Sequence, residues 1–328
     1  MITRRQALSA LGAAALTPPL SLFAQPSGKV WRIGLLQSGA RPASGLVPAP
    51  LRQALANLGY VDGKNVIYEG IWAEGKVARL PALAAELAQR RADVIVATGW
   101  PAARAARNAT STVPIVIAFG GDAVAAGHVA SLSHPGANVT GLSDLTIELS
   151  SKRLELLKET VPKASKIAIM WNQDDLGMTL RYREIDRAAH ALNVTVQALG
   201  VREPDDFEGA FAAMKRERPD ALFLVADVLT TLNRKRVIEF AAANRIPAMY
   251  EFAQTVEDGG LMSYGPDVGD AFGRVAYYID RILKGTKPAD LPLEQPSKFQ
   301  FVINMKTAKA LGLKIPDGIL LRADKVIE

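Results

Sequence analysis

Residue types that usually perform catalysis are sparse in this chain and do not form known motifs. The 328 residues include three histidines, His128, His134 and His190, and no cysteine. The histidines do not have metal-ligand spacing such as H-E-x-x-H, and the chain has neither a G-x-S-x-G nucleophile motif nor a G-x-x-x-x-G-K-S/T phosphate loop. Gly120-Gly121-Asp122 follows a predicted strand but lacks the third glycine of a dinucleotide-binding turn. We therefore expect no catalytic residues, no bound metal and no cofactor.

Small and polar residues instead gather where predicted strands end. Open α/β sheets bind ligands at the carboxyl ends of their strands. The helices that follow begin there with unpaired backbone N–H groups, which suit a carboxylate. The expected ligand-binding residues are Gln37, Ser38, Thr98, Gly99, Trp100, Asp122, Asn172, Asp227, Glu251 and Ser263.

The residues after the first and third predicted strands suit the polar end of a ligand. We expect Ser38, Thr98 and the backbone of Gly99 to hold an anionic or polar group. Trp100 would either stack on an aromatic ligand or cover the core, and the sequence does not distinguish these roles.

The acidic residues at strand ends have two possible roles. Asp227 and Glu251 would meet donor groups of the ligand. Asp122 and Asp227 could pair with a ligand ammonium, but taken alone they favour capping the helices that follow them, because aspartate is a preferred N-cap residue.

The elements that position these residues alternate between strands and helices, which is typical of a parallel sheet covered by helices. In the first half the predicted strands are 31–36, 66–72, 93–97 and 113–119, and the helices are 51–58, 77–90 and one that begins at Pro101. After Gly141 the pattern starts again. An apolar stripe predicts a helix near 147–161, followed by strands 166–171, 194–199, 221–225 and 247–250 and helices 180–192, 205–217 and 229–244. Asp205 and Glu208 suggest a capping box at the start of the helix 205–217.

The tail predicts further strands at 261–264 and 299–303, a helix 267–284 capped by Asp267, and a helix 306–311. The expected fold is α/β, with two similar open, mainly parallel, three-layer lobes joined by a three-stranded hinge. The first lobe would contain 29–140 and about 264–290. The second would contain 142–262 and about 295–328.

Composition supports a globular chain of two domains, with 49% hydrophobic and 22% charged residues. The net charge of +6 comes from scattered residues. A nucleic-acid surface would need a basic stripe with interleaved aromatic residues, and the sequence has none. We expect a monomer that binds no nucleic acid.

The N-terminus has the pattern of an export signal. Arg4 and Arg5 precede a short apolar run over 7–16, and Pro18 and Pro19 follow it. The run is about half the roughly 20 residues that a membrane span needs. Residues 1–24 are therefore predicted to be a signal peptide, of the twin-arginine or the general secretion type. The absence of cysteine excludes a lipid anchor on that residue, so we expect an unanchored periplasmic protein.

Six stretches resemble a known family, the ABC-transporter substrate-binding proteins related to tryptophan- and tyrosine-uptake binding proteins. They are LGYVDGKN at 58–65, LPALAAEL at 80–87, PGANVTG at 135–141, KRLELLK at 152–158, GGLMSYG at 259–265 and NMKTAKALG at 304–312. The resemblance covers nearly all of 30–328 and implies a type I periplasmic-binding fold with a three-stranded hinge. It implies aromatic amino acids, or for some relatives nucleosides, as ligands.

The sequence departs from the family pattern beside the expected pocket. Trp100 stands where the family usually has a small polar residue, and Ala123 follows Gly121-Asp122 where the family has proline. The segment 39–50 is also unusual, being rich in proline, alanine and glycine. These departures concern the ligand and leave the fold assignment intact.

The residues and the resemblance together predict a non-catalytic, extracytoplasmic solute-binding component of an ABC importer. It would capture an aromatic amino acid or a related aromatic compound by hinge closure, and its partner would be the membrane permease. The alternatives are a ligand-sensing subunit that signals to a membrane receptor, and the binding of a nucleoside-type ligand.

Overall fold

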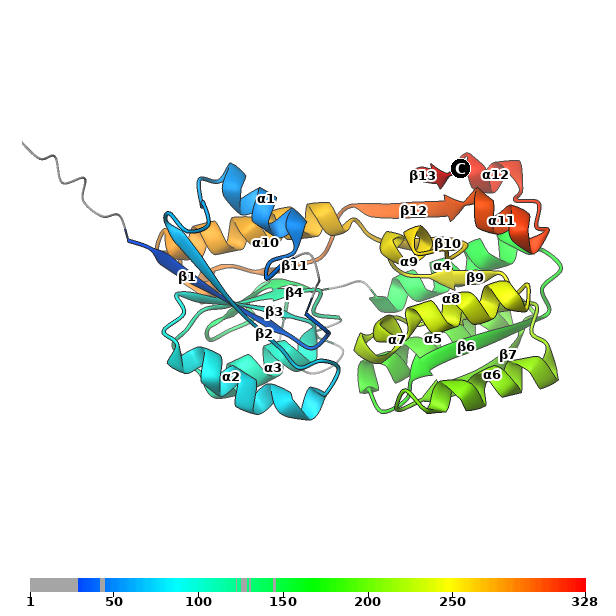
Figure 1. Cartoon of the computed structure of the whole chain (residues 1–328), viewed down its shortest axis with the longest axis horizontal. Coiled ribbons are helices and arrows are strands. Elements are labelled where there is room, and N and C mark those ends of the chain that lie inside the picture. The colour runs from blue at the N-terminus through cyan, green and yellow to red at the C-terminus, as the bar shows by residue number, and fades with distance from the viewer. Residues whose placement is uncertain (1–28, 42–44, 122, 125–128, 130, 144–145) are drawn as a thin grey trace, which may run out of the picture.

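The structure is a computed structural model that describes residues 29–41, 45–121, 123–124, 129, 131–143 and 146–328. The predicted signal peptide 1–24 and the candidate residue Asp122 lie outside the described residues. Within these ranges the chain forms two separate β-sheets, each covered by helices on both faces (Figure 1). The expected architecture of two mainly parallel lobes is confirmed.

The first sheet, with its helices, is called lobe 1. Its strand order is β11-β5-β4-β3-β1-β2, and every pair is parallel. The strands are β1 (Trp31–Gln37), β2 (Val66–Trp72), β3 (Val94–Thr98), β4 (Ile115–Ala118), β5 (Val139–Leu142) and β11 (Leu293–Glu294). One face packs against α1 (Ala49–Asn57) and α10 (Val268–Leu283), and the other against α2 (Leu80–Gln89) and α3 (Trp100–Ala109). The short helices η1 (Val77–Arg79) and η2 (Pro288–Asp290) lie in its connections.

The second sheet, with its helices, is called lobe 2, and its order is β13-β12-β10-β9-β8-β6-β7. Its strands are β6 (Lys166–Asn172), β7 (Thr195–Val201), β8 (Ala221–Leu224), β9 (Ala248–Tyr250), β10 (Met262–Pro266), β12 (Phe299–Asn304) and β13 (Lys325–Ile327). Only β10 and β12 pair antiparallel among the described strands. The helices are α4 (Thr146–Thr160), α5 (Leu176–Ala191), α6 (Asp206–Glu217), α7 (Val228–Leu232), α8 (Arg234–Ala243), α9 (Ala253–Glu257), α11 (Met305–Leu311) and α12 (Asp317–Leu320).

The chain passes between the two sheets three times. It leaves lobe 1 after β5, returns after β10 to form α10 and β11, and enters lobe 2 again as β12 (Figure 1). Three connections of this kind between two lobes are typical of proteins that move about a hinge.

Apolar runs explain most of the strands, and the exceptions have local causes. The predicted strand 113–119 is shorter, because Phe119 has a positive φ of 56° and leaves the extended conformation. The predicted helix 229–244 is two helices, α7 and α8, which meet at Asn233. The side-chain amide of Asn233 donates to the carbonyl of Leu229 at 2.9 Å, a local bond that competes with helix continuation.

The helix caps were predicted with mixed success. Asp267 caps α10 as expected, since its carboxylate accepts from the Asp270 N–H at 2.9 Å. The prediction of a capping box at Asp205 is wrong, because the side chain of Asp205 makes no cap hydrogen bond. The next residue, Asp206, instead accepts from the backbone of Arg202 at 2.8 Å.

Candidate ligand-binding site

The carboxyl ends of β1 and β3 place two predicted site residues near each other. The strands are parallel neighbours, with Gln37 opposite Thr98, and Ser38 directly follows Gln37. Ser38 is buried, and neither its Oγ nor the Oγ1 of Thr98 has a hydrogen-bond partner among the described residues. Buried hydroxyls are nearly always paired, so two unpaired ones at one sheet edge indicate a place for a polar ligand group.

Helix α3 begins beside Thr98. Its N-cap is Gly99, which has a φ of 78° and has no side chain to cap the helix. The N–H of Gly99 is used by the carbonyl of Ala118 at 2.9 Å, so that particular donor is not open to a ligand. The positive end of the α3 dipole still points at the same edge as the two hydroxyls, which favours a negatively charged group there.

Trp100 lies at the first position of α3. It is partly buried and packs against the apolar cluster between the sheet and α2 and α3. Of its two predicted roles, the cover over the core is thus present in the structure. Contact with a ligand ring remains a prediction. Gln37 is partly buried at the end of β1.

In lobe 2, Asn172 and Asp227 lie together at the ends of β6 and β8. The Asn172 Nδ2 donates to Oδ2 of Asp227 at 2.6 Å. The other oxygen of Asp227 accepts from the Thr230 N–H at 2.8 Å, and the Thr230 hydroxyl accepts from the Asp227 N–H at 2.9 Å, which completes a capping box on α7. The helix-cap interpretation of Asp227 is confirmed, and its contact with a ligand remains a prediction.

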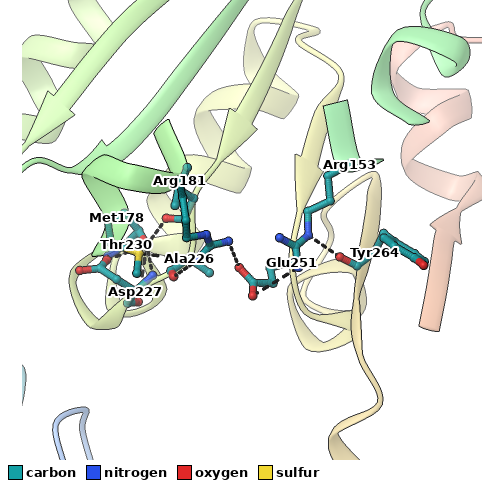
Figure 2. Close-up of polar contacts among 9 residues, drawn as sticks. Arg153, Met178, Arg181, Ala226, Asp227, Thr230, Glu251 and Tyr264 are labelled. Carbon is teal, nitrogen blue, oxygen red and sulfur yellow. Dashed lines mark hydrogen bonds and ion pairs between the residues drawn. The ribbon is translucent and has the colours of Figure 1, made fainter. Parts of the chain in front are cut away.

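Glu251, at the end of β9, lies between two arginines (Figure 2). Its Oε2 is 2.5 Å from Nη2 of Arg181, and its Oε1 is 3.4 Å from Nη2 of Arg153. The exposed fractions of the three side chains are 4%, 2% and 1%, so the ion pairs are buried. The donors next to Glu251 in this structure therefore belong to the protein, and a ligand contact of Glu251 stays a prediction.

The charge on Glu251 is maintained in spite of its burial. Desolvation alone would raise the pKa of this carboxyl. The positive charges of Arg153 and Arg181, with hydrogen bonds from Arg181 and the Ala226 backbone, outweigh that effect and lower the pKa below 4.5. Arg181 is further held by the Ala226 carbonyl, which accepts from its Nη1 at 3.1 Å.

The two arginines were missed by sequence reasoning, although their spacing carries a signal. Arg181 shares one face of α5 with buried Ile185 and Ala189, at i, i+4 and i+8. Arg153 lies on α4 next to buried Leu154 and three residues after buried Ser150. A charged residue on an apolar helical face must find a buried partner, and that requirement points to an ion pair.

Ser263 lies deeper than the other candidates. It lies on β10, three residues before β10 ends at Pro266, and it is opposite Tyr250 of β9. Its side chain is fully buried. Its Oγ has no hydrogen-bond partner among the described residues. The neighbouring residue Tyr264 connects this strand to the ion pairs, since its carbonyl accepts from Nε of Arg153 at 2.5 Å.

Among the described residues, the contacts between the two lobes include two beside the strand ends. The rings of Phe119 after β4 and Phe252 before α9 have centroids 6.1 Å apart and planes at 85°. Gly75, after β2, lies against Leu232 of α7, so closely that an added Cβ would be 2.7 Å from its Cδ1. The strand ends of lobe 1 and lobe 2 therefore face each other at close range.

Two parallel-sheet lobes, three crossings between them and polar strand ends that face one another define the class of two-lobed ligand-binding proteins that close about a hinge. Residues 35–327 match the family model described as ABC transporter substrate binding protein. The chain belongs to this family, whose members are extracytoplasmic, and the resemblance seen in the sequence is confirmed. Among the described residues, no helix combines the length and apolar character that a membrane crossing requires.

Three known relatives are similar to this chain over most of its length. A tyrosine-binding protein of Clostridioides difficile (strain R20291) is 29% identical over 289 residues, which is 88% of this chain and 83% of that protein. An ABC domain from Streptococcus pneumonia in complex with L-Trp is 28% identical, with a TM-score of 0.83 over 91% of this chain and 100% of the other. A ligand-free, open substrate-binding protein from Clostridium difficile is 27% identical, with a TM-score of 0.65 over 91% of this chain and 99% of the other.

The two structural relatives have similar sequence identity and coverage, yet their TM-scores to this protein are 0.83 for the complex with L-Trp and 0.65 for the open protein. The structure that fits better is the complex with L-Trp, and the one that fits less well is open and ligand-free. As a whole, this protein therefore matches the complex with L-Trp more closely than it matches the open, ligand-free protein.

Proposed function

We propose that this protein is the extracytoplasmic solute-binding component of an ABC importer, and that it binds an aromatic amino acid between its lobes without altering it. The family supports the role in solute binding, and relatives that are named for tyrosine or solved with L-Trp support the ligand class. The observation that carries the proposal is the pair of unpartnered, buried hydroxyls of Ser38 and Thr98 beside the start of α3.

The carboxylate of the amino acid would bind lobe 1. The hydroxyls of Ser38 and Thr98 can both donate to it, and each would then gain the partner that it lacks among the described residues. The dipole of α3 would stabilise the negative charge. A hydrogen bond to a charged group contributes about 1.5–3 kcal/mol, so each hydroxyl has a substantial share of the affinity.

The ammonium group would bind lobe 2. Asp227 follows β8 and forms no ion pair among the described residues, and Asn172 orients it through the 2.6 Å hydrogen bond. Trp100 would contact the aromatic side chain of the ligand. Closure then buries the ligand and desolvates its polar contacts, so that analogues with unmatched groups are rejected.

Delivery would follow from closure. We propose that lobe 1 and lobe 2, which the chain connects after β5, after β10 and before β12, move as two units, and that the closed form presents both to the membrane permease. Export by residues 1–24 would place a monomeric protein in the periplasm.

Thermal unfolding in the presence of candidate ligands tests the proposal. Twenty amino acids, nucleosides and aromatic acids are screened separately, and a ligand that binds the folded state raises Tm. We expect tryptophan, tyrosine or phenylalanine to give the largest increase. Ser38→Ala and Thr98→Val should reduce it, and Thr195→Val, at an exposed position of β7, should not. A screen in which nucleosides, or no compound at all, raise Tm contradicts the proposed ligand class.

A further inference from the structure

The contact between Phe119 and Phe252 joins the two lobes through aromatic rings. Phe119 follows β4 of lobe 1, and Phe252 precedes α9 of lobe 2. Their rings meet edge to face, with centroids 6.1 Å apart and planes at 85°. This is a favoured geometry for an aromatic pair, because the positive edge of one ring meets the negative face of the other.

The ring of Phe119 is held in place from its own lobe. Phe272 of α10 packs against it with centroids 5.4 Å apart and planes at 78°. Phe119 also has a φ of 56°, in the left-handed region that residues other than glycine rarely adopt. Strained backbone of this kind persists only where the surroundings enforce it, and it is concentrated at clamps and switch regions. Lobe 1 therefore presents this ring in a fixed position.

We propose that Phe119 is a positioning residue for closure: lobe 1 holds its ring ready, and Phe252 docks on it when the lobes come together. This inference rests on the proposed function and adds to it a contact that sets the closed-state population. The pair meets within the protein itself, so its contribution to affinity is the same for every ligand that the closed form encloses.

The contact acts on affinity through the open–closed equilibrium. A ligand that is enclosed only in the closed form has an apparent Kd equal to its intrinsic Kd divided by the closed fraction. Removing a contact that exists only in the closed form lowers that fraction and raises the apparent Kd. Aromatic pairs contribute about 0.5–1.5 kcal/mol beyond burial, which corresponds to roughly a 2- to 13-fold change in Kd.

A double-mutant cycle on ligand affinity tests this role. Phe119→Leu, Phe252→Leu and the double variant are titrated calorimetrically with L-tryptophan and with L-tyrosine. We expect each single variant to raise both Kd values by a similar factor of about 2 to 13. The double variant should be little weaker than a single one, because the ring–ring contact is lost only once. Phe211→Leu is the control, since it removes a stacked pair with Phe240 inside lobe 2.

The outcomes separate this inference from the proposed function. If the wild-type protein binds neither amino acid, the proposed function has failed. If the wild type binds and the effects of the two variants on Kd are additive, or either effect is absent, the docking role of Phe119 is wrong. An effect on L-tryptophan but not on L-tyrosine also overturns it, because the rings would then contact the ligand. Faster ligand dissociation in both single variants, with an unchanged Tm of the ligand-free Phe252→Leu protein, supports it.

Discussion

Arg181 and Glu251 form a buried ion pair at the end of β9, with Nη2 and Oε2 2.5 Å apart and exposed side-chain fractions of 2% and 4%. Arg153 approaches the same carboxylate from α4 and is anchored to the carbonyl of Tyr264 on β10. The three side chains thus connect α4, α5, β9 and β10 of lobe 2 just before the chain crosses to α10. They stabilise the part of lobe 2 from which the crossing begins.

Replacing Glu251 should destabilise lobe 2 strongly. Glu251→Gln leaves two buried arginines without their shared counter-charge, and removal of one partner of a buried ion pair costs about 3–5 kcal/mol. Chemical denaturation measures the loss in the free energy of unfolding. Glu203→Gln, at an exposed position before α6, serves as the control and should change it by less than about 0.5 kcal/mol. A loss at Glu251 as small as that of the control would contradict the assigned ion pairs.

The titration of Glu251 should be visible in the pH dependence of the free energy of unfolding. The pKa of Glu251 in the folded protein lies below its ordinary 4.5, so the stability that this group contributes is present above the unfolded-state pKa. It is lost as the pH falls through the folded-state pKa. Unfolding free energies measured from neutral pH to below 4.5 should therefore converge for wild type and Glu251→Gln. A constant difference between the two proteins across this range would mean that Glu251 does not titrate as assigned.

Asp227 should contribute to stability as a helix cap. Asp227→Ala removes the capping box of α7 and the acceptor of the Asn172 amide. The loss of a cap costs about 0.5–2 kcal/mol. Asp205→Ala is a matched control at the start of α6, where the side chain makes no cap hydrogen bond. Equal losses in thermal unfolding would argue against the cap at Asp227.

Gly75 should have a modest effect on closure. An added Cβ at Gly75 would lie 2.7 Å from Leu232 Cδ1 across the lobes, so the exposed side chain of Leu232 would have to turn away, and Gly75→Ala should raise the Kd for ligand by a small factor. Gly63→Ala is the control, because Gly63 has a similar φ, 74° against 77°, with no heavy atom of the described structure within 4 Å of an added Cβ. Both substitutions should cost about 1–2 kcal/mol of folding stability through backbone strain. A weaker affinity in both variants, or in neither, would contradict a closure contact at Gly75.

The fold was largely predictable because the strands are short apolar runs between turn-forming residues. The predicted strand 66–72 coincides with β2, and Asp267 caps α10 as its position before an amphipathic run indicated. Short elements without an apolar pattern, such as α9 and β13, were not predicted, because packing against neighbours forms them. Asn233 interrupts a helix that its neighbours favour, and its side-chain amide donates to the carbonyl of Leu229 at this position.

The site was predictable in its location but not in its contacts. Strand ends identified Ser38 and Thr98, whose unpaired hydroxyls the structure reveals. The partners of Glu251 come from α4 and α5, two helices far away in sequence, so no local pattern pairs them. The contact between Phe119 and Phe252 depends on how the lobes sit together, which three crossings permit but no local sequence pattern specifies.

Calorimetric titration of the protein with L-tryptophan and L-tyrosine, repeated with Ser38→Ala, tests the central claim most directly. The account predicts saturable binding of at least one of these amino acids, with a negative heat-capacity change from closure. It also predicts a Kd raised roughly 10-fold or more by loss of the Ser38 hydroxyl. The absence of binding by either amino acid, or an equal Kd for Ser38→Ala and the wild type, would contradict it.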